Sequence, residues 1–172
     1  MAAKKTVRRH KEPKATRPHM PGYISTDTKG LLPWKWAEDR LKKSRQYWIA
    51  TTRPNGAPHV MVVWGLWWDN AFCFSTGSKS RKARNLKANA RCVICNENAA
   101  EAVIVEGRAG TMRDVPRIRK FWSIYGRKYD LSGMGEDTSF LKEPVFVVRP
   151  TVVFGQAEKT FAKTATRWRF GK

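Results

Sequence analysis

An asparagine–glycine pair at positions 55–56 separates two β-prone segments, and this turn limits the folds open to the chain. The segments are residues 47–52 and 59–68, both rich in β-branched and aromatic side chains. Asn-Gly between two such runs is a strong short-range signal for a β-hairpin. An Asp-Asn turn at 69–70 then leads into a third β-prone run, residues 71–76. The sequence therefore predicts an antiparallel meander of three strands.

The second strand of this meander, residues 59–68, is apolar on both of its faces. Side chains alternate between the two faces of a strand, so such a strand has the core on one side. The other side then meets a helix, a ligand or a second subunit, and the residues alone leave these three open. One face carries Val60, Val62, Trp64, Leu66 and Trp68, and the other carries Met61, Val63 and Trp67.

The rest of the chain adds further strands and a few helices. Apolar residues at helical spacing predict helices that begin at Pro33, after an N-cap at Ser80, and after an N-cap at Asp114. Strands are predicted over residues 91–96 and 101–112, as a pair over 144–155 broken at Pro150, and over 167–170. A meandering, strand-rich order with inserted helices favours a small antiparallel β-barrel.

Length and charge limit the organisation and the partners. A chain of 172 residues predicts one domain, which we assign to residues 20–172. Residues 1–19 hold seven basic residues against one acid and predict a disordered arm, either a solvating tail or a nucleic-acid contact, with the tail slightly favoured. The net charge of +20 indicates a polyanionic partner: nucleic acid, an anionic membrane surface or a phosphorylated ligand. The chain has neither a long apolar run nor a secretory signal, so we expect a cytoplasmic protein without a membrane span.

Cysteine and histidine are too few for the common metal and hydrolase sites. Cys92 and Cys95 are three apart in a β-prone run and point to opposite faces, so with Cys73 they are expected to be free thiols. His59 is the one histidine outside the basic N-terminal segment, and no GxSxG motif accompanies it. We expect no metal, and no catalytic side chain is assigned.

Residues 74–86 contain the segment most suggestive of chemistry. A strand ends in Ser75 and Thr76, a short Gly-Ser loop follows, and a helix begins at Ser80 with Arg81 and Lys82. Free N–H groups at a helix N-terminus, hydroxyls and paired cations together suit a phosphate group. An ordinary basic helix start with a solvated face is the alternative, and the residues alone weigh the two evenly.

Three segments resemble the pyridoxamine 5'-phosphate oxidase-like superfamily, the flavin-binding split β-barrels. They are residues 50–60, an opening hairpin, residues 63–69, the next strand and turn, and residues 74–86, the phosphate-binding turn. The third is the most specific, because it contains Ser80-Arg81-Lys82-Ala83 and the Lys82-x-x-Asn85 spacing. The resemblance covers roughly residues 30–160.

The resemblance implies a mainly β fold, a six-stranded antiparallel split barrel of the FMN-binding type, working as a homodimer. FMN, or alternatively the deazaflavin coenzyme F-420, would lie at the subunit interface and exchange a hydride with a small organic substrate. Carried over by position, Arg81 and Lys82 would hold the cofactor phosphate. The other implied cofactor-binding residues are Ser75, Thr76, Ser80 and Asn85 near the phosphate, and Met61, Val62, Val63 and Trp64 along the ring. His59 is also expected to contact the cofactor, with a structural histidine as the equal alternative.

The chain departs from true pyridoxamine phosphate oxidases at several positions. Met61 and Leu66 stand where those enzymes have arginine and lysine, and Ala102 stands where they have glutamine. The C-terminal Arg-x-His motif is replaced by Arg167-Trp168-Arg169. We therefore expect a member of the broad reductase branch, which includes F-420-dependent enzymes, and no vitamin B6 oxidation.

Two other functions compete with this one. The first is a split-barrel FMN- or anion-binding protein without turnover, whose basic surface contacts nucleic acid. The second is a haem-binding relative, for which His59 is the one obvious axial ligand. We interpret most tryptophans (Trp34, Trp36, Trp67 and Trp68) as core and dimer packing, and Trp64 as the exception that lines an aromatic substrate pocket beside the ring. Tyr125, Tyr129 and the loop at 133–135 are either a cap over the site or a plain surface helix and loop, with the surface helix and loop favoured.

Overall fold

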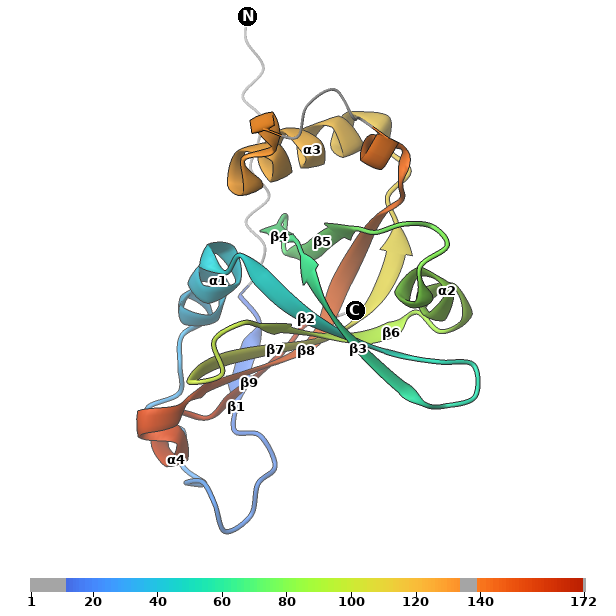
Figure 1. Ribbon diagram of the computed structural model, residues 1–172. Coiled ribbons are helices and arrows are strands. Elements are labelled where there is room, and N and C mark those ends of the chain that lie inside the picture. The colour runs from blue at the N-terminus through green and yellow to red at the C-terminus, as the bar shows by residue number, and fades with distance from the viewer. Residues whose placement is uncertain (1–11, 134–138, 172) are drawn as a thin grey trace, which may run out of the picture.

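The computed structural model describes residues 12–133 and 139–171, and these form one antiparallel sheet with helices around it (Figure 1). Hydrogen-bonded neighbours follow the order β1-β9-β8-β7-β6-β2-β3, while β5 pairs with both β8 and β4. The six long strands are β2 (Gln46–Thr52), β3 (Pro58–Trp64), β5 (Ala71–Ser75), β6 (Arg91–Asn96), β7 (Glu101–Thr111) and β8 (Val145–Ala157). The three short ones are β1 (Lys14–Thr16), β4 (Leu66–Trp68) and β9 (Thr166–Arg169).

The sheet is a split barrel. Strand β8 pairs with β7 along its length, with β5 through residues 145–148, and with β9 through residues 152–155. Strands β3 and β5 come close but are not hydrogen-bonded to each other, so the barrel stays open between them. The predicted mainly β, antiparallel split-barrel fold is confirmed.

The predicted hairpin is present, with one change in its turn. Residues 46–52 pair with residues 58–64 in an antiparallel register. The amide of Gly56 donates to the Arg53 carbonyl at 2.9 Å, and Gly56 has a φ of +84°. Pro54 and Asn55 therefore occupy the turn, and the glycine takes the left-handed position that follows it. At the next turn Asp69 and Asn70 both have positive φ, as the predicted two-residue connection requires.

Residues 59–68 do not form one continuous strand, contrary to the sequence prediction. The strand ends at Trp64, and β4 begins at Leu66 and pairs with β5 instead of β2. Gly65 lies at the break. A larger residue would not fit there, because its Cβ would overlap the Phe72 ring. Leu66 and Trp67 are both buried, so the alternation of faces does not continue through Gly65.

The predicted strand pair at 144–155 is instead one strand with an irregularity. Gly107 of β7 pairs with Pro150, whereas Glu106 pairs with Val152. Thr151 is therefore the extra residue of a β-bulge, and its hydroxyl donates to the Glu106 carbonyl at 3.0 Å. A bulge accommodates a proline, which has no N–H to contribute to the ladder, without ending the strand.

The helices begin where the sequence predicts. Helix α2 (Arg81–Ala88) is capped by Ser80, whose hydroxyl accepts the amide of Ala83, and α3 (Val115–Tyr129) is capped by Asp114. Helix α3 lies across one end of the barrel, over β4 and β5 (Figure 1). The remaining helices are α1 (Trp34–Lys43), α4 (Phe161–Thr164) and the 3-10 turns Leu131–Gly133, Ser139–Lys142 and Glu158–Thr160.

The core lies in two parts. The larger cluster fills the barrel and contains Trp34, Phe72 and Trp168 together with residues from most strands. The smaller cluster joins α3 to β4, β5 and the start of β8, and includes Phe121 and Tyr125. Trp34, Trp67 and Trp168 contact one another through Trp34, so these tryptophans pack the core, as predicted for Trp34 and Trp67. In the described part of the chain, no helix has the length and apolar character needed to cross a bilayer.

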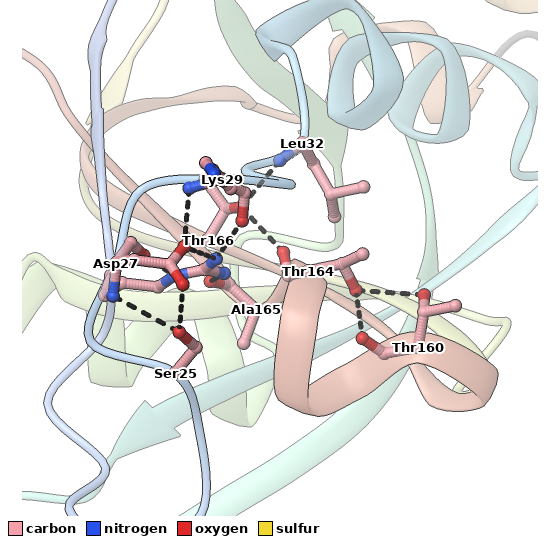
Figure 2. Close-up of polar contacts among 9 residues, drawn as sticks. Ser25, Asp27, Lys29, Leu32, Thr160, Thr164, Ala165 and Thr166 are labelled. Atoms are coloured by element: carbon pink, nitrogen blue, oxygen red, sulfur yellow. Dashed lines mark hydrogen bonds and ion pairs between the residues drawn. The ribbon is translucent and has the colours of Figure 1, made fainter.

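The predicted disordered arm is wrong in its second half. Residues 14–16 form β1, which pairs with β9 and covers the edge of the sheet. The Arg17 guanidinium is almost fully buried and donates to the backbone carbonyls of Asp27, Lys29 and Ala165. Figure 2 shows these three acceptor residues gathered in one place. Edge pairing and these charge-assisted bonds order a basic segment that composition alone assigns to solvent. Residues 1–11 lie outside the described part of the chain.

Candidate functional site

The start of α2 presents several groups able to bind an anion. Ser80 caps the helix, and the Thr76 and Ser80 hydroxyls are 3.2 Å apart. Arg81 and Lys82 follow in the first turn, and within the described residues their side chains make neither ion pairs nor hydrogen bonds. Burial lowers the pKa of the Lys82 amine, and no described carboxylate compensates. First-turn amides and uncompensated cations favour an anionic ligand at this point.

A chain of hydrogen bonds joins α2 to the β2–β3 hairpin. Asn85 is fully buried, and its side-chain amide donates to the Thr51 hydroxyl at 3.0 Å. That hydroxyl lies 3.4 Å from Nδ1 of His59. The pKa of His59 is lowered by desolvation and by the nearby cations Arg53, Lys82 and Arg81. His59 therefore lies within reach of the charges of Arg81 and Lys82, although more than 20 residues separate it from them in the sequence.

Asn85 also carries an unsatisfied atom. Its Oδ1 is buried and has no hydrogen-bond partner in the described protein. A buried acceptor without a partner costs free energy unless a water or ligand donor reaches it. Asn85 therefore leaves one buried acceptor of α2 unsatisfied.

A cavity of about 180 Å³ lies between the end of β5, the start of β8 and helix α3. Three sequence-predicted residues, Trp64, Ser75 and Thr76, line it. The remaining lining residues are Gly77, Trp122, Tyr125, Leu131 and Glu143. An apolar, aromatic wall facing two hydroxyls suits a planar ligand with polar substituents.

The four predicted ring-binding residues of β3 divide between its two faces. Met61, Val62 and Trp64 are 46%, 39% and 43% exposed, whereas Val63 is buried in the barrel core. Val63 therefore has only its backbone free for a ligand. Met61 lies on the same face of the strand as Val63, and Val62 lies on the opposite face with Trp64.

Val62 belongs to an exposed apolar face. Trp48 is opposite Val62 in the β2–β3 register and is 48% exposed, and Val60 is exposed beside them. The sequence prediction of an apolar second face that does not meet the core is correct for β3. Contiguous exposed apolar side chains are unusual on a monomeric surface and mark contact sites.

Sequence reasoning placed α3 on the surface, and its inner face instead builds part of the site. Tyr125 and Tyr129 are buried, and the Tyr129 ring stacks on Trp64 with centroids 4.5 Å apart and the two planes parallel. The Tyr129 hydroxyl accepts the Gly65 amide at 2.8 Å and so fixes the break between β3 and β4. Aromatic residues at helical spacing over 121–129 were the available signal. Residues 134–138 of the following loop lie outside the described part of the chain.

Lys128 completes this contact and was not singled out from the sequence. Its amine donates to the Tyr47 hydroxyl at 2.9 Å and to the Gly65 carbonyl at 3.0 Å. Desolvation lowers the pKa of Lys128 to about 8. The arrangement ties the end of α3 to the strand break and thereby holds Trp64 at the cavity.

The cysteines do not contribute nucleophiles to this site. Burial raises the pKa values of Cys73 and Cys92 to about 12, and it also raises the pKa of Cys95. Among the described residues, no group of three or more His, Cys, Asp or Glu side chains is arranged to hold a metal ion. The site offers binding and orientation by hydroxyls, cations and aromatic rings.

The split barrel, the basic turn at the start of α2 and the aromatic cavity point to a known class of protein. Residues 34–156 match the pyridoxamine 5'-phosphate oxidase family, so the chain belongs to this family. A search of curated proteins finds no match.

Solved structures agree with the family. The chain is similar to an F420 reductase at 26% identity and a TM-score of 0.57, covering 67% of this chain and 94% of that one. It also resembles a FAD-binding protein from Mesorhizobium loti (17%, TM-score 0.59, 79% and 94% covered). A haem-binding protein from Mycobacterium smegmatis has the same fold (16%, TM-score 0.58, 78% and 62% covered). Proteins with this fold thus include an F420 reductase, a FAD-binding protein and a haem-binding protein.

Proposed function

We propose that the protein is an oxidoreductase that uses FMN or the deazaflavin coenzyme F-420 to exchange a hydride with a small organic substrate. The observation that carries the proposal is the juxtaposition of two unpaired cations at the start of α2 with an aromatic cavity lined by Ser75 and Thr76. A phosphorylated cofactor with a planar ring system needs both features. Family membership and the likeness to an F420 reductase support the same conclusion.

The residues present fit such a cofactor, with the phosphate at α2 and the ring toward Trp64. Arg81 and Lys82 would hold the phosphate, with the Thr76 and Ser80 hydroxyls beside them. The unsatisfied Oδ1 of Asn85 would accept from a ribityl hydroxyl. When bound, the cofactor supplies the hydride chemistry, and the protein orients it and shields it from water.

The exposed apolar face of β2 and β3 supports a homodimer as part of this proposal. Trp48, Val60 and Val62 lie next to the backbone of β3 that would contact the ring. A second copy on this face would cover these apolar side chains next to Trp64, which lines the cavity.

The cofactor assignment is tested by titrating the purified protein with FMN and with F-420 and following cofactor fluorescence. The double variant Arg81→Ala/Lys82→Ala is expected to weaken binding by about 100-fold, because two charge-assisted contacts are lost. The matched control is Arg84→Ala/Lys87→Ala, which removes the same charge from exposed positions of the same helix and should leave affinity within about threefold.

Turnover is tested separately with the loaded protein. Reduced cofactor should be reoxidised by a quinone acceptor faster in the presence of the protein than in buffer. If neither cofactor binds, or if the protein instead takes up haem with comparable affinity, the proposal is wrong. If the cofactor binds and no acceptor from a quinone and nitro-aromatic panel is reduced, the protein is a carrier and not an oxidoreductase.

A further inference from the structure

Three arginines from three different strands lie side by side on the sheet. Arg91 of β6 is directly opposite Arg108 of β7, and Arg108 is directly opposite Arg149 of β8. We refer to these three residues as the arginine row. Directly opposed Cα atoms are about 5 Å apart, so the row spans about 10 Å. All three side chains are exposed.

The arginine row has no internal compensation. Within residues 12–133 and 139–171, none of the three guanidinium groups forms an ion pair or a hydrogen bond. Glu106 is the nearest acid on this face of β7, and it is opposite Val93 and Val152 instead of an arginine. Like charges directly opposed across strands destabilise a sheet. Two such pairs in succession are a cost that an anionic ligand would remove.

A groove of about 560 Å³ lies against the row. Arg91 and Arg108 line one part of it together with one acid, Glu106, and Ala50, Pro58 and Val93 give it apolar walls. Hydroxyls come from Thr52 and, at the bulge of β8, from Thr151. The groove therefore has room for an organic group beside the cations, which a flat basic surface does not offer. Its walls Ala50 and Pro58 are on the same face of β2 and β3 as Val60 and Val62, so a second copy on that face would border the groove.

This groove is separate from the cavity assigned to the cofactor. The two share no lining residue. The groove is not lined by Ser80, Arg81, Lys82 or Asn85 of the α2 site. Thr51 links the two sites, because it lines the groove and its hydroxyl accepts a hydrogen bond from Asn85.

We propose that the groove beside Arg91, Arg108 and Arg149 binds an organic di- or triphosphate. The phosphate chain lies along the arginine row, because guanidinium groups make paired bonds to phosphate oxygens and the row is longer than a single phosphate. The organic part lies against Ala50, Pro58 and Val93. A small ligand accounts for a walled groove better than a nucleic-acid backbone does.

The test is calorimetric titration of the full-length protein with sodium tripolyphosphate and with ATP, both free of magnesium. Each is expected to bind with one site per chain, and ATP more tightly, because its organic part adds contacts in the groove. The variant Arg91→Gln/Arg108→Gln/Arg149→Gln should weaken both by about tenfold or more.

Two matched variants make the result specific. Lys142→Gln/Lys159→Gln/Lys163→Gln removes the same charge from exposed positions elsewhere and should change affinity by less than about threefold. Arg81→Ala/Lys82→Ala, which tests the cofactor site, should leave tripolyphosphate binding unchanged. A folded arginine-row variant, checked by circular dichroism, should still bind the flavin.

Several results would overturn the proposal. If the lysine control weakens binding as much as the arginine-row variant does, the binding depends on net charge and not on this groove. If only the α2 variant loses binding, the phosphates bind in the cofactor site. If neither tripolyphosphate nor ATP binds, and a DNA oligonucleotide binds the wild type but not the arginine-row variant, the surface binds nucleic acid instead.

Discussion

Gly65 lies where the backbone leaves one half of the barrel for the other. A Cβ at this position would overlap the Phe72 ring and approach the Cys73 carbonyl oxygen to 3.0 Å. Both of its backbone polar groups are engaged, the amide to Tyr129 and the carbonyl to Lys128 and Tyr129. The site thus depends on one glycine that positions Trp64 before the break.

Gly65→Ala is expected to destabilise the fold by about 2–4 kcal/mol, because neither the buried ring nor the backbone has space to move. Gly110→Ala is the matched control, since a Cβ there meets nothing within 4 Å, and it should change stability by less than about 0.5 kcal/mol. Urea unfolding followed by tryptophan fluorescence measures both. Equal stability of the two variants would show that the break tolerates a side chain.

Lys128 gives the stability a pH dependence of predictable sign. Its folded pKa is about 8, below the ordinary value of 10.5, because its amine is desolvated. Between these two values the unfolded chain binds more protons than the folded one, so the free energy of unfolding rises with pH. The facing groups Tyr47 and Tyr129 have pKa values raised by burial and stay protonated in this window, and the charges of Glu97 and Arg45 also act on the Lys128 amine.

The comparison is between the wild type and Lys128→Met, which keeps the apolar stem. The stability of the wild type relative to the variant should rise by roughly 1–2 kcal/mol between about pH 7 and pH 9.5, after allowance for solvent screening. Using the difference removes the tyrosine contributions common to both proteins. A constant difference across this range would mean that the Lys128 amine is not perturbed.

At the scale of elements, β1 and the loop after it depend on one buried arginine. Arg17 joins residues 27–29 to Ala165, just before β9. The Leu32 amide donates to the Thr166 hydroxyl at 2.8 Å (Figure 2). These bonds connect the start of the chain to its last strand. They hold an edge of the sheet far from the candidate site.

Arg17→Ala should therefore free β1 and the loop without disturbing cofactor binding. We expect a loss of about 1–3 kcal/mol and faster amide exchange in β1 and β9, because charge-assisted bonds to three carbonyls are removed. Lys14→Ala, an exposed change on the same strand, should have little effect. Unchanged exchange in β9 would show that pairing alone holds β1.

At the scale of the whole molecule, the exposed apolar face is the feature that a single chain leaves incomplete. Val62 lies at its centre, opposite Trp48. If a second copy covers this face, Val62→Lys buries a charge in the interface and should convert a dimer into a monomer, measured by sedimentation velocity. Flavin affinity should fall in parallel.

The control for this change is Val115→Lys, because Val115 is also an exposed valine but lies at the start of α3. It should leave both the sedimentation coefficient and flavin affinity unaltered. A wild-type protein that sediments as a monomer at all concentrations would contradict the dimer.

The sequence alone was sufficient for features encoded within a few residues. The hairpin at Asn55-Gly56 and the caps at Ser80 and Asp114 depend on neighbours along the chain, and the structure contains all three. The resemblance then gave the fold class, which the structure confirms.

Tertiary structure decided whatever depends on residues far apart in the sequence. The break at Gly65 follows from the position of Phe72, the burial of Arg17 from carbonyls at both ends of the chain, and the role of α3 from stacking between Tyr129 and Trp64. Local patterns cannot specify these contacts, because the register of the strands and the packing of the helices set which side chains meet. The arginine row is such a case: three separate arginines become neighbours only when β6, β7 and β8 pair.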